Sequence, residues 1–210
     1  MKIGILGSGN VGCALAKGFA AEGHVVFLAT RDLNSQKSAA LKASFPQVTI
    51  CDFATTATEA ELAVLCTPWP TAQDALKLAR AEENLNGKVL VDTNNPIERE
   101  ADTVHIAAGW EGSAGQMVQG WLPDTQVVKC WNSTGADNFY KPQFDAIPTM
   151  FIAGDNTDAK QQVGDLVRAF GWEPFDTGPI ERSRECEALA VLWINNAMSN
   201  AGGHHAFKML

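Results

Sequence analysis

The stretch Lys2-Ile-Gly-Ile-Leu-Gly-Ser-Gly-Asn-Val-Gly12 decides the fold of this 210-residue chain. Its apolar run leads into the spacing Gly7-x-Gly9-x-x-Gly12, and an alanine-rich helical pattern continues to Glu22. A strand, a glycine turn and a helix in this order are typical of a dinucleotide site. Gly7 would permit the tight turn, Gly9 would let a pyrophosphate approach, and Gly12 would let the helix pack closely. The alternative is a glycine-rich turn that binds nothing.

The rest of the chain alternates short apolar runs with helical patterns. Residues 24–29 form a second strand, which completes a β-α-β unit with a right-handed crossover. Further strands are predicted at residues 48–50, 61–66, 88–92, 126–131, 149–153 and 172–176, and helices at 37–45, 72–83, 113–123 and 182–196, with another helix after Asp155 that Gly171 closes. We therefore expect an α/β, Rossmann-like, doubly wound, mainly parallel sheet over residues 1–181. Residues 182–210 would form a short C-terminal helical segment.

Two segments depart from this alternation. Residues 99–112 show no clear period and are predicted to form a loop or an irregular insertion. The C-terminal helix carries apolar residues on almost every face, so it is buried either in its own subunit or against a partner. Burial of this helix against a second copy of the chain would make the protein a homodimer.

Composition and charge exclude several classes of protein. Hydrophobic residues make up 46% of the chain and charged residues 19%, as in a globular protein, and no apolar run approaches the roughly 20 residues of a membrane span. The net charge of -8 argues against a nucleic-acid partner. The five cysteines lack metal-ligand spacing and indicate reduced thiols. Without an export signal, we expect a soluble cytoplasmic protein with no metal and no membrane insertion.

The residues after the second strand bear on the choice of cofactor. An acidic residue about 20 positions past the glycines would bind the ribose of NAD, and Asp32 offers this reading. A hydroxyl and a cation suit the 2'-phosphate of NADP instead, and Thr30 and Arg31 offer both. Lys37 would add a second positive charge, or it is simply a solvated lysine on a helix. We favour NADP.

Three more turns follow strands at the edge where open α/β sheets bind ligands. The first is Thr67-Pro68-Trp69-Pro70, whose indole either walls the cofactor cleft or packs in the core. The second contains Asn95, Pro96 and Ile97, and the third is Asn132-Ser133-Thr134. Their amides and hydroxyls would face a nicotinamide, although ordinary polar turns would look the same.

Several separated segments together resemble one family, the small NADP-dependent oxidoreductases typified by coenzyme F-420:NADP oxidoreductase. The resemblance covers nearly the whole chain. Its matching pieces are Gly4–Gly12, Ala29–Asp32, Asp92–Pro96, Val127–Asn132, Phe151–Asp155, Asp176–Pro179 and Glu187–Trp193. Asp32 stands where the family has a basic residue after the arginine, which keeps NAD open as an alternative. A similar pattern occurs in the cytoplasmic reductase domains of membrane ferric reductases, where a flavin is the acceptor.

The resemblance implies roles for individual residues. Ser8 to Val11 would bind the pyrophosphate, Thr30 and Arg31 the 2'-phosphate, and the three turns would surround the nicotinamide. The predicted cofactor-binding residues are Gly7, Ser8, Gly9, Asn10, Val11, Gly12, Thr30, Arg31, Lys37, Thr67, Pro68, Trp69, Asn95, Pro96, Asn132, Ser133 and Thr134.

No catalytic side chain is predicted, because hydride transfer between stacked rings requires proximity and orientation only. The sequence shows no Ser-His-Asp grouping, no paired catalytic carboxylates and no tyrosine-lysine pair, since its one tyrosine, Tyr140, lies in a predicted Phe-Tyr-Lys-Pro loop. We therefore expect an NADP(H)-dependent oxidoreductase with a flat small-molecule acceptor, either coenzyme F-420 or a flavin such as FMN or FAD. The alternatives are a non-catalytic NADPH-binding module that senses redox state or docks on a reductase, and a small hydroxy-acid or imine reductase.

Overall fold

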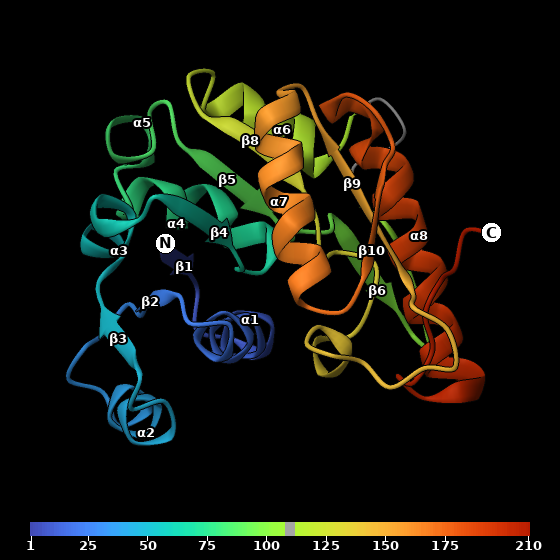
Figure 1. Cartoon of the computed structure of the whole chain (residues 1–210), viewed down its shortest axis with the longest axis horizontal. Coiled ribbons are helices and arrows are strands. Elements are labelled where there is room, and N and C mark those ends of the chain that lie inside the picture. The colour runs from blue at the N-terminus through green and yellow to red at the C-terminus, as the bar shows by residue number, and fades with distance from the viewer. Residues whose placement is uncertain (108–111) are drawn as a thin grey trace.

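Eight strands form one sheet in the computed structural model, which describes residues 1–107 and 112–210. Their order is β10-β9-β8-β5-β4-β1-β2-β3, and neighbours are parallel except for β8 and β9 (Figure 1). The strands are β1 (Lys2–Leu6), β2 (Val25–Ala29), β3 (Val48–Cys51), β4 (Leu62–Leu65), β5 (Val89–Asp92), β8 (Gln126–Lys129), β9 (Thr149–Gly154) and β10 (Glu173–Asp176). The predicted Rossmann-like, mainly parallel sheet is confirmed.

Strand β1 lies at the point where the winding of the sheet reverses. The chain proceeds from β1 to β2 and β3 on one side, and then returns to β4 on the other side of β1. Ile3, Ile5 and Leu6 have no exposed surface, as expected of a strand covered on both faces. Ligands of open α/β sheets bind beyond the carboxyl ends of the strands at such a point. The turn after β1 is therefore where a ligand is expected.

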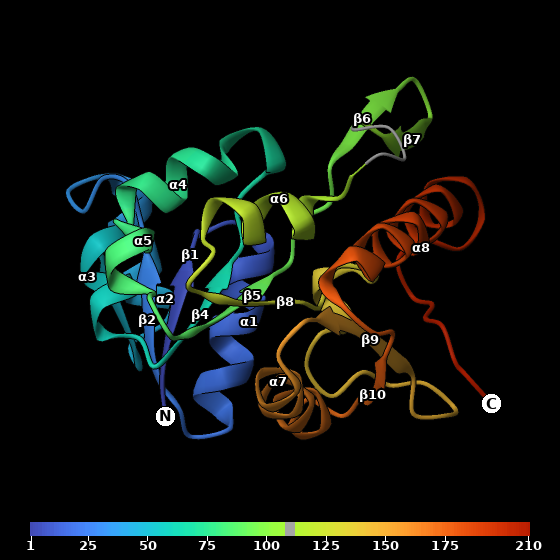
Figure 2. The same ribbon diagram turned by 90° about the horizontal axis from the view of Figure 1, so that it is seen from above.

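Helices cover both faces of the sheet. Figure 2 shows α4, α5 and α6 on one side, and α1 and α7 on the other. The helices are α1 (Asn10–Ala21), α2 (Gln36–Ser44), α3 (Phe53–Glu59), α4 (Ala72–Leu78), α5 (Ala81–Asn84), α6 (Ala114–Trp121), α7 (Thr157–Ala169) and α8 (Ser183–Asn196), and the short turns are η1 (Trp69–Thr71), η2 (Ala136–Asn138), η3 (Ile180–Arg182) and η4 (Ala197–Ala201). Several helices start at a side chain that accepts a backbone N–H: Ser35, Asp52, Ser113 and Asn156.

The loop predicted over residues 99–112 is wrong in its first part. Strands β6 (Ile97–Glu100) and β7 (Thr103–Ile106) form an antiparallel hairpin that extends from the body beside α8 (Figure 2). Residues 108–111 of that predicted loop lie outside the described residues. The Asn195 side chain of α8 accepts a hydrogen bond from Val104 N (2.8 Å) and donates one to Val104 O (3.0 Å). Because this support comes from a helix far along the chain, local sequence periodicity did not indicate the hairpin.

The helix predicted over residues 72–83 is also wrong as a single element. Arg80 adopts a left-handed backbone conformation with φ of 50°, which separates α4 from α5. Helix α3 is missing from the predicted elements because its sequence contains three threonines, which have low helix propensity. The helix nevertheless forms after the Asp52 cap, whose Oδ1 accepts Thr55 N at 2.7 Å.

The C-terminal segment packs against its own chain. Cys186, Ala190 and Trp193 are buried on one face of α8, whereas Leu192 is 58% exposed, so burial on every face is not found within one chain. The chain then returns along β9, where Thr149 N donates to Phe207 O at 2.8 Å. Association into a homodimer stays a prediction.

Composition led to two expectations, that the cysteines are reduced thiols and that no segment is apolar and long enough to span a membrane. All five cysteines are free thiols. Within the described part of the chain, no helix combines the length and the apolar surface needed to span a bilayer.

One buried ammonium joins the middle of the sheet to α6 and α8. Lys129 at the end of β8 has no exposed surface, and its Nζ lies 2.6 Å from Asp92 Oδ2, 2.7 Å from Asn94 O and 2.8 Å from Glu187 Oε1. Glu187 of α8 also accepts the first-turn amides of α6, Ala114 N and Gly115 N, both at 3.2 Å. These bonds connect β5, β8, α6 and α8 through a single cation.

Burial and the neighbouring charges shift the pKa values of Lys129 and Glu187. Burial alone would lower the pKa of Lys129, but the carboxylates of Asp92 and Glu187 outweigh it and raise that pKa above the ordinary lysine value. Burial raises the pKa of Glu187, and the attraction of Lys129 limits the rise. A Cβ on Gly115 would lie 2.2 Å from Ser183 Oγ and 3.2 Å from Lys129 Cε, so only glycine allows α6 to come this close.

Replacing Lys129 with methionine leaves two buried carboxylates without a cation, and we expect the free energy of unfolding to fall by about 3–5 kcal/mol near neutral pH. Because the pKa of Glu187 is already raised above 4.5 by burial, the folded variant binds protons more readily than the unfolded chain, and its stability falls as pH rises above that value. Urea unfolding at about pH 5.5 and about pH 8 measures both effects.

The stability difference between wild type and variant should be smaller at the lower pH, and an equal difference at both would contradict the burial of ionised carboxylates. Lys160→Met is the matched control. It removes an ion pair whose partner, Asp176, is about half exposed, so it should cost at most about 1 kcal/mol.

Candidate cofactor site

The glycine turn between β1 and α1 has backbone requirements that side chains would violate. Gly7 has φ of +130°, and a Cβ there would lie 2.7 Å from Cys66 O at the end of β4. A Cβ on Gly12 would lie 1.9 Å from Gly7 O. Gly9 differs, since a Cβ there would meet nothing within 4 Å. Two of the glycines are needed for the turn itself, and the third borders open space.

The same turn exposes the start of α1. Gly9 occupies the N-cap position without any side-chain hydrogen bond, and the first turn of the helix carries no acidic residue. Gly9 and Asn10 are exposed, and Ser8 and Val11 are half-buried. A helix N-terminus with these properties is a suitable place for an anion, because its N–H groups and dipole point toward it.

The loop after β2 contains the predicted 2'-phosphate residues in two different environments. Thr30 is buried, and its hydroxyl lies 3.3 Å from the Ser38 hydroxyl of α2. Arg31 and Lys37 are exposed, and within residues 1–107 and 112–210 neither belongs to a salt bridge. The Asp32 carboxylate accepts Asn34 N at 2.9 Å and thereby closes the loop. The two cations are thus available to an anion, while Asp32 has a local structural role.

The positive charge of Lys37 also affects a thiol in the first turn of α1. Burial raises the pKa of the Cys13 thiol in the first turn of α1, and the positive charge of Lys37 opposes this rise. The Cys13 thiol itself lies 3.8 Å from Ser8 O in the glycine turn. Lys37 therefore contributes positive potential to the region of the turn.

The turn after β4 packs against α6. Trp69 in η1 is half-buried and stacks on Trp121, with ring centroids 5.5 Å apart and an interplanar angle of 14°. Pro68 is exposed, and Thr67 presents a buried hydroxyl oxygen without a partner among the described residues. Trp121 is a packing partner of the kind expected if Trp69 packs within the protein. Contact between the Trp69 indole and a cofactor stays a prediction.

The turns after β5 and β8 are joined by a pair of carboxamides. Asn95 Nδ2 donates to Asn132 O at 2.8 Å, and Asn132 Nδ2 donates to Asn95 Oδ1 at 2.9 Å and to Cys186 O at 2.9 Å. Asn132 is 5% exposed, and its Oδ1 has no hydrogen-bond partner within the described residues. The pair therefore leaves one buried acceptor unused at this edge of the sheet.

The backbone is strained where β8 leads into this turn. Trp131 has φ of 52°, an uncommon value for a bulky residue, and its indole is held between Phe19 and Phe170. Pro96 and Ser133 are buried beside the carboxamide pair, and Thr134 Oγ1 accepts Asn138 Nδ2 at 3.4 Å. Strain of this kind persists only where packing fixes it, so the position of Asn132 is rigid.

The buried charges beneath this edge were not predicted from the sequence. Asp92, Lys129 and Glu187 lie within longer segments that resemble the family, and no role was expected for them individually. The signal was available, because Lys129 interrupts the otherwise apolar run Val127-Val-Lys-Cys-Trp131, and a lysine inside a buried strand requires a carboxylate partner.

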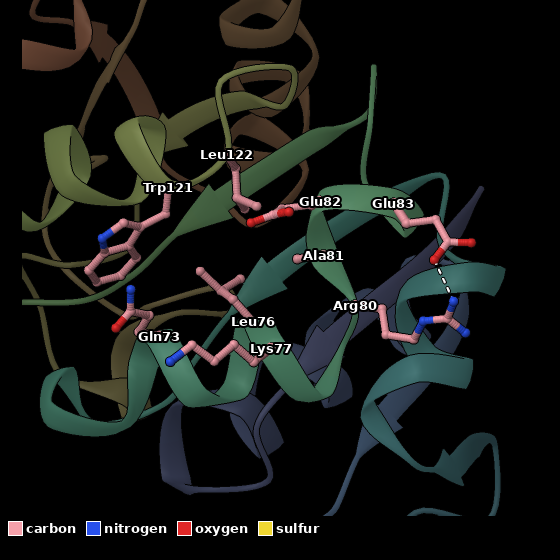
Figure 3. A pocket seen from close by; sticks show the side chains of 9 residues that line it. All are labelled: Gln73, Leu76, Lys77, Arg80, Ala81, Glu82, Glu83, Trp121 and Leu122. Carbon is pink, nitrogen blue, oxygen red and sulfur yellow. Dashed lines mark hydrogen bonds and ion pairs between the residues drawn. The ribbon is translucent and has the colours of Figure 1, made fainter.

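The hollow in Figure 3 lies elsewhere. It has a volume of about 320 Å³ and is bordered by α4, α5 and the end of α6, with Leu76, Trp121 and Leu122 among its lining residues. None of its lining residues belongs to the predicted cofactor set. Among the described residues, no cluster of three or more His, Cys, Asp or Glu side chains is arranged to hold a metal ion.

Comparison with known proteins identifies the family of the chain. The family model described as NADP oxidoreductase, coenzyme F420-dependent, matches residues 2–96. The chain is 30% identical over 190 residues to the metalloreductase STEAP3 of Rattus norvegicus, a match that covers 90% of this chain and 36% of that protein. The crystal structure of a candidate F420-dependent NADP reductase from Arthrobacter sp. FB24 superimposes with a TM-score of 0.93 at 30% identity, covering 100% of this chain and 99% of the other.

The F420-dependent NADP reductase of Methanothermobacter marburgensis is 32% identical over 218 residues, and the match covers 96% of each protein. Identity at this level over two proteins of matching extent, together with the shared fold, shows that the chain belongs to the F420-dependent NADP reductase family, a family of NADP-linked oxidoreductases.

Proposed function

We propose that this protein transfers a hydride between NADP(H) and a flat redox partner, with a deazaflavin of the coenzyme F-420 type as the first choice and a flavin as the second. The observation that carries the proposal is the glycine turn at the switch point, where Gly9 borders open space above an uncapped helix N-terminus. Relatives named F420-dependent NADP reductase support the acceptor class.

In this proposal the pyrophosphate binds at Gly7 to Gly12, against the N-terminus of α1. The 2'-phosphate binds Arg31, with Lys37 adding positive potential, since guanidinium geometry matches a phosphate. The buried Thr30 closes the base of this subsite through its contact with Ser38.

The nicotinamide end then lies over the turns after β4, β5 and β8. Within the described part of the chain, Asn132 Oδ1 is a buried acceptor without a donor, and the carboxamide N–H of a nicotinamide can supply one. Thr67, Pro68, Trp69 and Pro96 would complete the walls around the ring.

The chemistry requires little else of the protein. Hydride passes directly between the two rings, so the side chains bind, orient and exclude water, while the cofactor supplies the reactive carbon. The proposal therefore assigns no acid, base or nucleophile to a side chain.

Turnover tests the proposal directly. NADPH oxidation is followed at its absorbance maximum with F-420, FMN, FAD or no acceptor present, and we expect oxidation with F-420 to exceed that with either flavin by at least about tenfold. NADPH binding without turnover by any of these acceptors would favour the non-catalytic module instead.

Gly9→Ala separates cofactor binding from folding. The new methyl group has open space in the protein, so thermal stability should stay within about 0.5 kcal/mol, yet it enters the space assigned to the pyrophosphate. We expect the Kd for NADPH to rise at least about tenfold, measured by fluorescence titration. Gly12→Ala is the contrasting variant, since its Cβ meets Gly7 O and should destabilise the fold itself. An unchanged Kd in Gly9→Ala would remove the pyrophosphate from this turn.

Arg31→Ala tests the choice between NADP and NAD. Removing an exposed guanidinium should weaken NADPH by about 1.5–3 kcal/mol, the range for hydrogen bonds to a charged group, and leave NADH almost unchanged. Titrations of both cofactors against wild type and variant measure the preference. Equal affinity of the wild type for NADH and NADPH would overturn the assignment and return Asp32 to consideration.

A further inference from the structure

All three N–H donors of the Lys129 ammonium have an oxygen acceptor. Its three partners are Asp92 Oδ2, Asn94 O and Glu187 Oε1, at 2.6, 2.7 and 2.8 Å. Since an ammonium has three N–H donors, this geometry saturates it and defines its orientation. The carboxylate of Asp92 completes the arrangement, because its Oδ1 accepts Asn94 N at 2.9 Å and Asn94 Nδ2 at 2.7 Å.

Asn94 is thereby held at its amide, its side chain and its carbonyl by one buried group of charges. The next residue, Asn95, forms the carboxamide pair with Asn132. The other end of that pair is fixed by Cys186 O, which precedes Glu187 in α8. Both halves of the pair are therefore tied to the charge group, one through β5 and the other through α8.

This arrangement uses both N–H donors of the Asn132 carboxamide and one of the Asn95 carboxamide, and among the described residues Asn132 Oδ1 has no donor. An unpaired buried acceptor costs free energy, and it is maintained here by a fixed framework on both sides.

We propose that Lys129 is a positioning residue for hydride transfer: through Asn94 and Glu187 it fixes the Asn95–Asn132 pair, so that Asn132 Oδ1 receives the carboxamide of the nicotinamide. This inference rests on the proposed function and deepens it. Lys129 itself touches neither cofactor nor acceptor. Its effect is confined to the nicotinamide end, because its polar contacts are with Asp92, the turn after β5 and Glu187 of α8, and α8 in turn holds Asn132 through Cys186 O.

The test compares two ligands, NADP⁺ and 2',5'-ADP, which shares the 2'-phosphate and adenosine but lacks the nicotinamide. In Lys129→Met, measured where the variant is folded by circular dichroism, the Kd for NADP⁺ should rise about tenfold while that for 2',5'-ADP stays within about twofold. The single-turnover rate of NADPH with the best acceptor should fall about 10- to 100-fold, as expected for a displaced reactive ring.

Two further variants keep the result interpretable. Glu187→Gln retains the size of the side chain and one acceptor, so it should shift the same quantities in the same direction by a smaller factor. Lys160→Met removes a half-buried lysine of α7 that pairs with Asp176 of β10, away from the charge group, and should leave both affinities and the rate unchanged.

Equal weakening of both ligands in Lys129→Met and Glu187→Gln would show a general structural role and overturn the proposal. So would unchanged NADP⁺ affinity and rate in both variants. Failure of the wild type to bind 2',5'-ADP and NADP⁺ would instead overturn the proposed function, and this inference with it.

Discussion

The burial of one lysine with two carboxylates is the constraint on which the rest of the structure depends. Charges removed from water are stable only if every one of them is paired and hydrogen-bonded, which demands fixed geometry. Here that demand is met by atoms from β5, β8, α6 and α8, including the first-turn amides of α6. The N-terminal dipole of α6 offsets part of the excess negative charge, since two carboxylates face one ammonium. No simple apolar contact would fix the register of these four elements as closely.

The consequences appear at the carboxyl edge of the sheet. Glycine at position 115 lets α6 reach α8, and the same approach brings Glu187 to Lys129. Trp131 accepts a left-handed backbone because Phe19 and Phe170 fix its ring, and Asn132 follows it directly. A loop edge would normally be mobile, but here the residues beyond β5 and β8 are attached to the core by charges and by aromatic packing. Such rigidity suits a site whose chemistry depends on orientation alone.

The sequence was most informative where a local rule determines structure. The Gly7–Gly12 spacing and the apolar strands predicted the sheet correctly, and Ser113 with Gln116 predicted the start of α6, because turns, caps and periods are local properties. The hairpin of β6 and β7 escaped prediction because Asn195, remote in sequence, stabilises it. Helix α3 escaped because its threonines favour other conformations, and the break at Arg80 because a left-handed arginine has no sequence signature. Within the candidate site, the turn residues could be predicted, whereas the pairing of Asn95 with Asn132 depends on contacts across strands.

The family model matches the part of the chain that contains most of the predicted cofactor residues. Residues 2–96 match the family model, and they contain the glycine turn, the Thr30–Arg31 loop and the turn that ends at Pro96. The β6–β7 hairpin starts at the following residue, Ile97, and it contacts α8, whose buried face carries Glu187. Relatives named for different substrates match 90% and 96% of this chain, so a shared fold does not by itself determine the acceptor. Helix α8 is attached to the Asn95–Asn132 pair through Cys186 O, and the hairpin begins two residues after Asn95, so both elements border the place where the proposed function puts the nicotinamide.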